Sequence, residues 1–403
     1  TEIYTLSLHD ALPIYLLQEA LAWFPETQAL RRDLHQHPEL GYREVRTAGV
    51  VVRELRALGL EPRTGIAETG GTAWVEGGEP GPRRLLRFDM DALPVEEQTG
   101  AAYASCEPGR MHACGHDGHV AIGLTVARLL QRHRAELAGS VLLVFQPAEE
   151  GLNGAERMLA EGALQNLAFD AALAVHLWND FPVGKLLISA GPFMAGSAVF
   201  RIVLQGRGGH GASPHQTADP VLAAAQLITT LQGVVARNVA PLEAAVLSVC
   251  SVRAGEAFNV IPDRAELRGT LRWFSPQVGE TLRRRLHQVT EGVGAAMGCG
   301  VTIELQDLTP PVINDPATVE QVRCVARQLL PQAEIVPEYC TMGSEDFAYF
   351  LQVVPGCMVF VGSANAERGL NAPHHHPRFD FDEAALPQAA ALMAGWALGL
   401  GAQ

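Results

Sequence analysis

The chain of 403 residues is longer than one hydrophobic core ordinarily supports, so its length favours two domains. Hydrophobic residues make up 48% and charged residues 18%, as in compact globular proteins. The net charge of −14 argues against nucleic acid and anionic membrane as partners, because both repel an acidic surface.

The seven cysteines are scattered along the chain without paired spacing, and their number is odd. This usage favours a reducing compartment over a disulfide framework, so we expect a cytoplasmic protein. No apolar run reaches the roughly 18 residues that a transmembrane helix needs.

Residues 1–14 have neither the basic start nor the apolar middle of a signal peptide, and no initiator Met. They join abruptly to a helical pattern that begins at Tyr15, and they resemble the translation of a sequencing adapter. We interpret them as a non-native or disordered leader, with a genuine but poorly ordered arm as the alternative.

From Tyr15 onward, helical and strand periods alternate, which is typical of an α/β layer with helices on both faces of a sheet. The continuous apolar runs at 141–145 and 171–177 predict strands that are buried on both faces. The predicted helices are 15–34, 45–58, 120–133 and 155–161, the predicted strands are 72–75, 85–88, 141–145 and 171–177, and a turn is predicted at 78–82.

The middle of the chain has a different order: strand, helix, strand, strand, helix, strand. The predicted ranges are 197–205, 220–238, 245–252, 264–274, 276–297 and 301–305. This order is the ferredoxin-like arrangement. The α/β pattern resumes near Pro316, with a strand at 358–361. We therefore predict a catalytic α/β domain with a mixed sheet (15–187 and 307–403), interrupted by an inserted α+β dimerisation or lid domain (188–306).

The segment MHACGHDGH (111–119) is the most informative stretch, because it offers a thiol, three imidazoles and a carboxylate within nine positions. An adjacent acidic pair (149–150), a lone His176 and a histidine triplet (374–376) follow later. Transition metals bind N and S ligands together with carboxylates, and metal-assisted hydrolysis also needs a free carboxylate as base. The sequence therefore predicts a metal-dependent hydrolase.

These residues follow or close predicted strands, and the carboxyl ends of strands in an open α/β sheet meet at one edge. Taken singly, each signal is weak: a lone His176 is more often a core residue, an acidic pair is more often solvated surface, and a histidine triplet is solvated surface about as often as not. Their joint occurrence at strand ends argues against coincidence.

Eight segments, in order and spacing, resemble the co-catalytic metallohydrolases that include aminoacylases and glutamate carboxypeptidases. The similarity runs from about Tyr15 to the end. It is greatest to the amidohydrolase branch of hippurate hydrolases, N-acyl-amino-acid amidohydrolases and plant auxin-conjugate hydrolases. The segments are RRDLHQHPELGYRE (31–44), RFDMDALPVEEQTG (87–100), MHACGHDGH (111–119), VFQPAEEG (144–151), GRGGHGASPH (206–215), FNVIPD (258–263), MGSEDFAYF (342–350) and HHPRFDFDE (375–383).

The resemblance implies two divalent metal ions per subunit, and such donors suit zinc, manganese, cobalt or nickel. Cys114 would bridge both ions. His116 and Glu150 would complete the ligands of one ion, and His176 and His375 those of the other.

Within the histidine triplet, the resemblance selects His375 over His374 and His376, because His375 stands two residues before the family's proline, here Pro377.

The resemblance also implies roles outside the ligand set. Glu149 would be the general base, and Asp91 would orient a ligand imidazole. His210 of the inserted domain would stabilise the oxyanion, reaching across a homodimer; loop packing is its alternative. Asn259 and Arg272 would bind the substrate carboxylate, although Arg272 could equally be a surface charge.

Two positions depart from related patterns. Asp89 stands where related peptidases carry a metal-binding His, a replacement that is normal in the amidohydrolase branch. Ser344 stands where a glycine is common. The larger side chain could narrow the pocket, so the pattern does not specify which substrate is bound.

We therefore expect hydrolysis of N-acyl amino acids, with a metallo-carboxypeptidase or dipeptidase acting on short peptides as the alternative. A non-catalytic metal-binding or ligand-sensing relative is disfavoured, because none of the implied ligands is missing. The sequence lacks the G-x-G-x-x-G that would follow the first strand of a dinucleotide-binding domain, and the G-x-S-x-G of a serine hydrolase.

Overall fold

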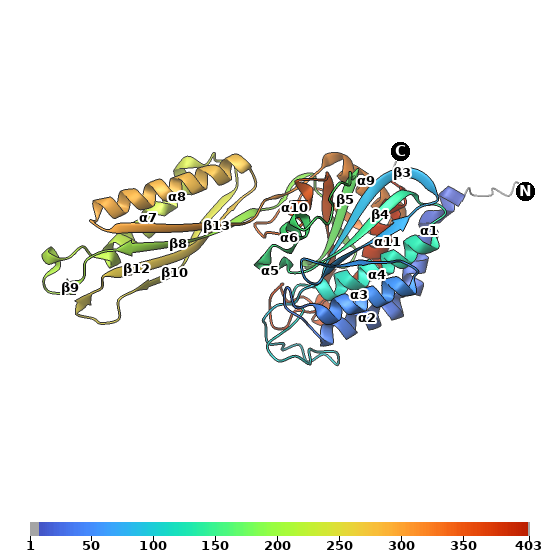
Figure 1. Cartoon of the computed structure of the whole chain (residues 1–403), viewed down its shortest axis with the longest axis horizontal. Helices are drawn as coiled ribbons and strands as arrows, with labels where there is room; N and C mark the ends of the chain where they lie inside the picture. Colours follow the sequence, from blue (N-terminus) through green and yellow to red (C-terminus); the bar gives the residue numbers. More distant parts are fainter. Residues whose placement is uncertain (1–7, 402–403) are drawn as a thin grey trace, which may run out of the picture. The chain divides into compact units, whose positions relative to one another are not determined.

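The computed structural model describes residues 8–401, which form two compact units (Figure 1). The first contains the chain up to Gly191, the stretch Ile313–Tyr339, and the chain from Asp346 onward. The second contains Pro192–Val312 and Cys340–Glu345. The predicted leader at 1–14 falls partly outside the described residues, and helix α1 begins at Leu8.

The first unit is built on a mixed sheet, in which the described residues form eight strands in the order β1-β2-β4-β3-β5-β16-β6-β15. The central strands β4, β3, β5 and β16 run parallel, so their carboxyl ends share one edge. The strands are β1 (Arg63–Ile66), β2 (Gly70–Glu76), β3 (Glu79–Asp89), β4 (Ala138–Gln146), β5 (Ala171–Pro182), β6 (Lys185–Leu187), β15 (Glu334–Val336) and β16 (Gly356–Ala364).

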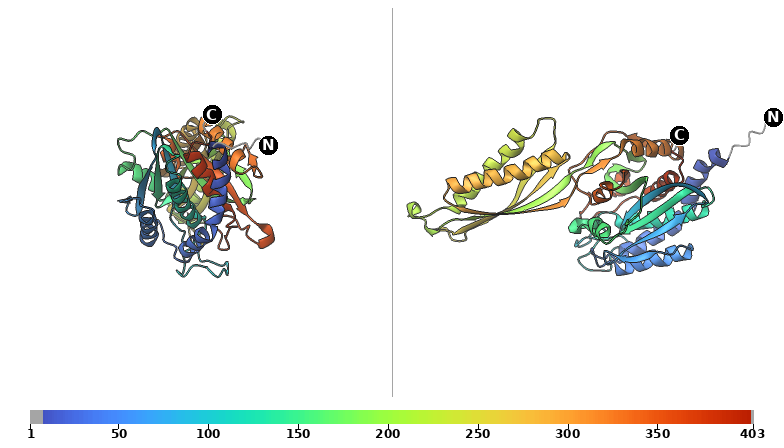
Figure 2. Two further views of the ribbon diagram at one scale, coloured as in Figure 1. Left: turned by 90° about the vertical axis from the view of Figure 1, so that its right-hand side faces the viewer. Right: turned by 45° about the horizontal axis from the view of Figure 1, so that its top comes forward.

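Helices cover both faces of this sheet (Figure 2), which confirms the predicted α/β architecture. On β4, Val141 and Leu143 belong to the core that includes α4 and α11, whereas Leu142 and Val144 are buried on the other face. Burial on both faces explains the continuous apolar run. The helices are α1 (Leu8–Ala22), α2 (Phe24–Gln36), α3 (Val45–Ala57), α4 (His116–Arg132), α5 (Glu149–Leu152), α6 (Gly154–Ala160), α9 (Pro316–Leu329), α10 (Ala348–Leu351), η2 (Ala366–Arg368) and α11 (Ala385–Ala397).

The single helix predicted at 15–34 is wrong, because the structure has two helices, α1 and α2, separated at Trp23. Trp23 leaves the helical conformation with ψ of 5°, and Pro25 occupies the first turn of α2. Proline lacks the N–H that a continuous helix would use, and it favours a helix start.

Two further predicted boundaries are also wrong. The segment 78–82 is not a separate turn, because β3 already begins at Glu79, where it pairs with Ala138. His176 does not close its strand: β5 continues to Pro182 because β16 pairs with it as far as Ala364.

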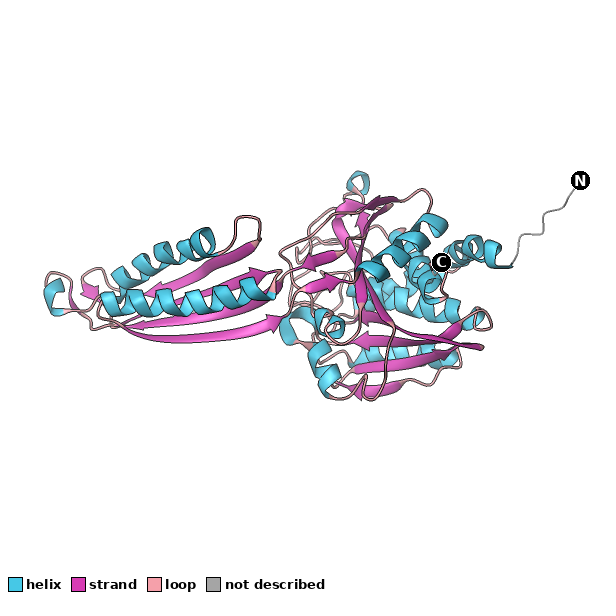
Figure 3. Ribbon diagram, turned by 90° about the horizontal axis from the view of Figure 1, so that it is seen from above, coloured by secondary structure: helices cyan, strands magenta, loops and turns pink. Residues whose placement is uncertain are grey.

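The second unit has the ferredoxin-like arrangement that the pattern predicts. Its antiparallel sheet has the order β10-β12-β8-β13, and α7 and α8 run along one face (Figure 3). Asp219 caps α7 by accepting from the N–H groups of Val221 and Leu222. The elements are β8 (Gly196–Gln205), β9 (Gly209–His210), η1 (Pro214–Gln216), α7 (Pro220–Asn238), β10 (Ala245–Ala254), β11 (Val260–Ile261), β12 (Arg264–Trp273), α8 (Pro276–Ala296) and β13 (Gly300–Thr309). The short strands β7 (Gly191–Met194) and β14 (Val312–Asn314) pair with each other where the chain passes from one unit to the other.

In the part of the chain that the structure describes, no helix is both long and apolar enough to cross a membrane.

Candidate metal centre

The segment 111–119 leads into helix α4, whose first residue is His116. Gly115 precedes the helix with a φ of 92°, a left-handed conformation that favours glycine. The resulting turn buries the Cys114 thiol just before the helix and the His116 ring in its first turn. The backbone therefore sets the position of both side chains.

Two imidazole rings approach this turn with defined protonation. His176 Nε2 lies 3.5 Å from the sulfur of Cys114. His176 Nδ1 donates to the Leu177 carbonyl at 2.7 Å, and His116 Nδ1 donates to the Asp91 carbonyl at 2.9 Å. Because Nδ1 of each ring donates to a carbonyl, Nε2 is the nitrogen that remains for a metal ion.

The acidic pair is held by a third carboxylate. The N–H groups of Glu149 and Glu150 donate to the two carboxylate oxygens of Asp91, each at 3.0 Å. Ala148 turns the chain at this point with a φ of 56°. Carboxylate oxygens of Glu149 and Glu150 and a ring nitrogen of His116 lie within 4.8 Å of one another. Asp91 thus brings the acidic pair to the imidazole.

Two members of the histidine triplet are committed to other contacts. The half-buried His374 ring stacks on Trp178 with 4.6 Å between centroids, and its Nε2 donates to the Leu177 carbonyl at 2.9 Å. Burial lowers the pKa of His374 to about 4, so the ring is neutral at pH 7. His376 Nδ1 accepts from the Arg378 N–H at 3.0 Å.

His375 faces the other donors. Its backbone has a φ of 65° and donates its N–H to the Ala113 carbonyl at 2.8 Å. Its Nε2 lies 3.2 Å from Oε1 of Glu150, and both groups come within 4.8 Å of the Cys114 sulfur. The structure therefore places His375, rather than its neighbours, beside the thiol.

Asp89, His116 and His119 form an adjacent cluster with donor atoms within 4.8 Å. Both nitrogens of His119 are occupied: Nε2 accepts from the Leu177 N–H at 3.0 Å, and Nδ1 donates to Asp89 at 2.5 Å. Asp89 also accepts from Arg87 at 2.6 Å. His119 has no lone pair left, so we assign this cluster a supporting role.

The donor atoms around Cys114 fall into overlapping groups, one of which joins His116 to Glu149 and Glu150. Donor atoms within 4.8 Å of one another join Cys114 to His116 and His176 in one group, and to Glu150 and His375 in another. The other four side chains thus lie around the sulfur atom of Cys114. The assignment of each ligand to a particular ion stays a prediction.

The residues present fit a pair of divalent cations. The buried atom His116 Nε2 has no hydrogen-bond partner in the described structure, and Glu150 Oε1 has none apart from its 3.2 Å approach to His375 Nε2. Burial and the charge of Glu150 raise the pKa of the Cys114 thiol well above its ordinary value. Cations would reverse that effect and hold the thiolate, and they would also occupy the unpartnered nitrogen and oxygen.

A buried ionic network beneath this turn was missed at the level of sequence. Arg31 of α2 is completely buried and bonds Asp117 at 2.8 Å and Asp380 at 2.9 Å. His35 bonds the same Asp117 at 2.7 Å. Burial alone would raise the pKa of Asp117, but Arg31 and His35 hold it well below its usual range. The signal was present as the i, i+4 spacing of Arg31 and His35 in RRDLH.

Glu44 supports the acidic turn from below. It is fully buried and accepts from the Ala148 N–H at 2.8 Å and from the Thr69 hydroxyl at 2.6 Å. Burial, with a smaller contribution from the charge of Asp91, raises the pKa of Glu44 to about 7.

His210 and Asn259 lie together on the second unit. His210 ends β9, which pairs with β11, and its neighbour Gly211 donates its N–H to the Asn259 carbonyl at 2.9 Å. His210 Nδ1 accepts from the Ala212 N–H at 3.0 Å. The side chains of His210 and Asn259 are both exposed.

Arg272 lies near the opposite end of β12, eight residues after Arg264, which at about 3.4 Å per residue is roughly 27 Å away. The structure therefore does not bring Arg272 together with Asn259 within one chain. Arg272 Nη1 instead donates to the hydroxyl of Ser344 at 2.7 Å.

Thiol, imidazole and carboxylate donors at the carboxyl edge of a mixed α/β sheet define a metal-dependent hydrolase. Residues 85–398 match the sequence profile of peptidase family M20/M25/M40, and the chain belongs to this family. It is an enzyme of the family's amidohydrolase branch, with metal-dependent amide hydrolysis as its general chemistry.

Similar proteins occur in both a plant and a bacterium. IAA-amino acid hydrolase ILR1-like 2 of Arabidopsis thaliana is 41% identical over 92% of this chain and 84% of its own length. N-acetyl-L-cysteine deacetylase of Bacillus subtilis is 39% identical over 89% of this chain and 84% of its own. The crystal structure of Bacillus subtilis YXEP, a dinuclear metal-binding peptidase from the M20 family, is 36% identical with a TM-score of 0.81, over 94% of this chain and 98% of that one.

The raised pKa of Glu44 gives a pH-dependent stability. In the folded chain this pKa is about 7 against an ordinary 4.5, so folding favours the protonated carboxyl. The contribution is complete below pH 4.5 and is lost as the pH rises through 7, by up to about 3 kcal/mol. Urea unfolding between pH 5 and pH 8 should show this decline in the wild type and a flatter profile for Glu44→Gln. Equal slopes for the two proteins would contradict the assignment.

Proposed function

We propose that this enzyme hydrolyses the amide bond of N-acyl amino acids. The observation that carries the proposal is the position of Glu149, a carboxylate held beside His116 and Glu150 by its N–H bond to Asp91. Two relatives reported above are named for substrates in which an acyl or auxin group is attached to an amino acid: the IAA-amino acid hydrolase and the N-acetyl-L-cysteine deacetylase. Their similarity supports this substrate class.

Two divalent cations held by Cys114, His116, Glu150, His176 and His375 would acidify a water molecule and polarise the substrate carbonyl. Glu149 takes the proton of the attacking water while the water oxygen bonds to the carbonyl carbon. The carbon–nitrogen bond then breaks, and Glu149 returns the proton to the departing amine. The products are a carboxylic acid and a free amino acid.

The second unit would bind and orient the substrate. Arg272 offers a guanidinium fork to the substrate carboxylate, and Ser344 holds that fork by a 2.7 Å hydrogen bond. His210 would donate to the developing oxyanion, with Asn259 beside it. Arg272 lies roughly 27 Å along β12 from the start of that strand, and Asn259 precedes the strand. One substrate can therefore contact both Arg272 and Asn259 only if two chains form the site. We therefore propose a homodimer.

A metallo-carboxypeptidase or dipeptidase is the second candidate, favoured by the description of the Bacillus subtilis structure as a peptidase. Both candidates cleave an amide beside a free carboxylate, so the same site serves either. Dipeptides assayed beside N-acyl amino acids separate the two functions.

Glu149→Gln should lower kcat on N-benzoylglycine and N-acetylmethionine by about 10²–10⁴-fold, because the proton acceptor is lost while the shape is kept. Glu156→Ala, an exposed acid on α6, is the control and should leave the rate unchanged. Metal analysis accompanies both proteins. A Glu149→Gln variant with full metal and full activity would remove Glu149 as the base. Wild type that cleaves dipeptides and no acyl amino acid would favour the peptidase instead.

His375→Ala should lose about one metal ion per subunit, whereas His376→Ala should retain the wild-type content, because the latter ring bonds the backbone of its own turn. Elemental analysis after dialysis against metal-free buffer measures the difference. Equal metal content in the two variants would exclude His375 as a ligand.

Ser344→Gly should raise KM for N-benzoylglycine about two- to tenfold with kcat nearly unchanged, because the hydrogen bond that orients Arg272 is lost. Ser344→Thr keeps the hydroxyl and should restore KM. N-benzoylglycinamide lacks the carboxylate and serves as the control substrate. A parallel loss on both substrates would show a general structural effect rather than orientation of Arg272.

A further inference from the structure

The sheet of the second unit has one face beneath α7 and α8 and one open face. On β12, Ala265 and Leu267 are buried in the core that the helices cover, whereas Arg264, Glu266 and Arg268 alternate onto the open face. A cavity of about 740 Å³ lies over these polar residues. Its volume falls within the range of small-molecule sites, roughly 300–1,000 Å³.

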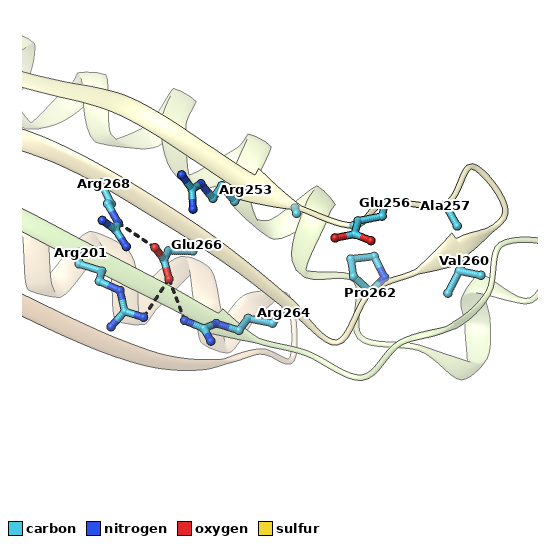
Figure 4. A pocket seen from close by; sticks show the side chains of 11 residues that line it. Arg201, Arg253, Glu256, Ala257, Val260, Pro262, Arg264, Glu266 and Arg268 are labelled. Carbon is cyan, nitrogen blue, oxygen red and sulfur yellow. Dashed lines mark hydrogen bonds and ion pairs between the residues drawn. The ribbon is translucent and has the colours of Figure 1, made fainter.

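Three arginines of this cavity converge on one carboxylate (Figure 4). Glu266 accepts from Arg201 Nη2, Arg264 Nη2 and Arg268 Nε, each at 2.8 Å. The hydrogen bonds from Arg201 and Arg268 lower the pKa of Glu266 to about 2. Each guanidinium has five N–H groups, so most donors remain available to a ligand.

A fourth arginine, Arg253, stands opposite Glu266 in the register of β10 and β12. Its side chain is exposed, and within residues 8–401 it makes no hydrogen bond or ion pair. In Figure 4 it lies on the neighbouring strand without a bond to Glu266. Arg253 therefore adds a complete guanidinium to the cavity.

The positive charge of the cavity is incompletely balanced. Arg201 and Arg268 are paired directly across β8 and β12, an arrangement in which like charges repel. Arg201 Nε is buried without a hydrogen-bond partner in the described structure. The four guanidiniums share the cavity with Glu256 and Glu266, and Arg201 also pairs with Glu304, which leaves a surplus of one positive charge in a chain of net charge −14.

We propose that this open sheet face binds a small molecule that carries a phosphoryl group. The dianion neutralises the opposed arginines, and guanidinium forks match the geometry of phosphate oxygens. Ala257, Val260 and Pro262 line the same cavity and offer apolar surface to the rest of the ligand. This site is separate from the candidate metal ligands, all of which belong to the first unit.

Isothermal titration of the metal-loaded enzyme at constant ionic strength tests the proposal, with phenyl phosphate as the probe. Benzenesulfonate, which has the same ring but a single charge, is the matched ligand control. Arg253→Ala should weaken binding of phenyl phosphate about tenfold, the effect of one charge-assisted contact. Arg237→Ala removes an exposed arginine from α7 and should have no effect. Both variants keep the metal ligands, so phosphate bound by metal cancels in this comparison.

A second pair of variants tests the role of the central carboxylate. Glu266→Gln removes the anion that competes for the arginines and should tighten binding, whereas Glu291→Gln makes the same charge change on the exposed surface of α8 and should not. Thermal unfolding confirms that each variant folds. The proposal is overturned by any one of three results: no saturable binding of phenyl phosphate, equal binding of benzenesulfonate, or equal effects of the two members of either variant pair.

Discussion

The carboxylate of Asp91 ties together three segments that are distant in the sequence. Both of its oxygens hold the N–H groups of the acidic pair after β4, and its own carbonyl fixes the ring of His116 at the start of α4. Asp91 alone, two positions after the end of β3, therefore sets the position of the proposed base relative to a proposed metal ligand. Glu44 reinforces the same turn through Ala148.

Charged residues inside the first unit are kept ionised by pairing rather than by water. Arg31 is completely buried and is matched by Asp117 and Asp380, and Arg87 is matched by Asp89 and Asp346. Removing one member of such a pair leaves an uncompensated buried charge, which costs far more than a surface ion pair is worth. Asp117 belongs to the segment that carries Cys114 and His116, so its ion pair ties that segment to helix α2.

Much of this structure could be predicted because local signals agree with the final packing. The bounds of α7 are correct to the residue, since Asp219 caps a helix whose first residue is Pro220. The break at Trp23 was missed because the apolar spacing continues through it. The short strand β15 carries too few residues to show a period, and α11 is apolar on all sides, so no stripe reveals it.

The site was less predictable than the fold, because it depends on which atoms already have partners. The sequence shows three consecutive histidines, and only the structure shows that His374 and His376 bond elsewhere. Likewise, Arg31 looks like a solvated helix residue until its burial is known. The grouping of Asn259 with Arg272 also looked simple in the sequence, although β12 separates the two along its length.

His375 differs from the other proposed ligands in its surroundings, because its side chain is 54% exposed whereas those of His116 and His176 are buried. Loop backbone, rather than the core, holds it in place. A ligand that can swing into solvent lowers the barrier to exchange of its ion. Under the proposed ligand assignment, the ion bound by His375 would exchange with solvent faster than the other ion. The metals available around the protein would therefore decide which element occupies that position.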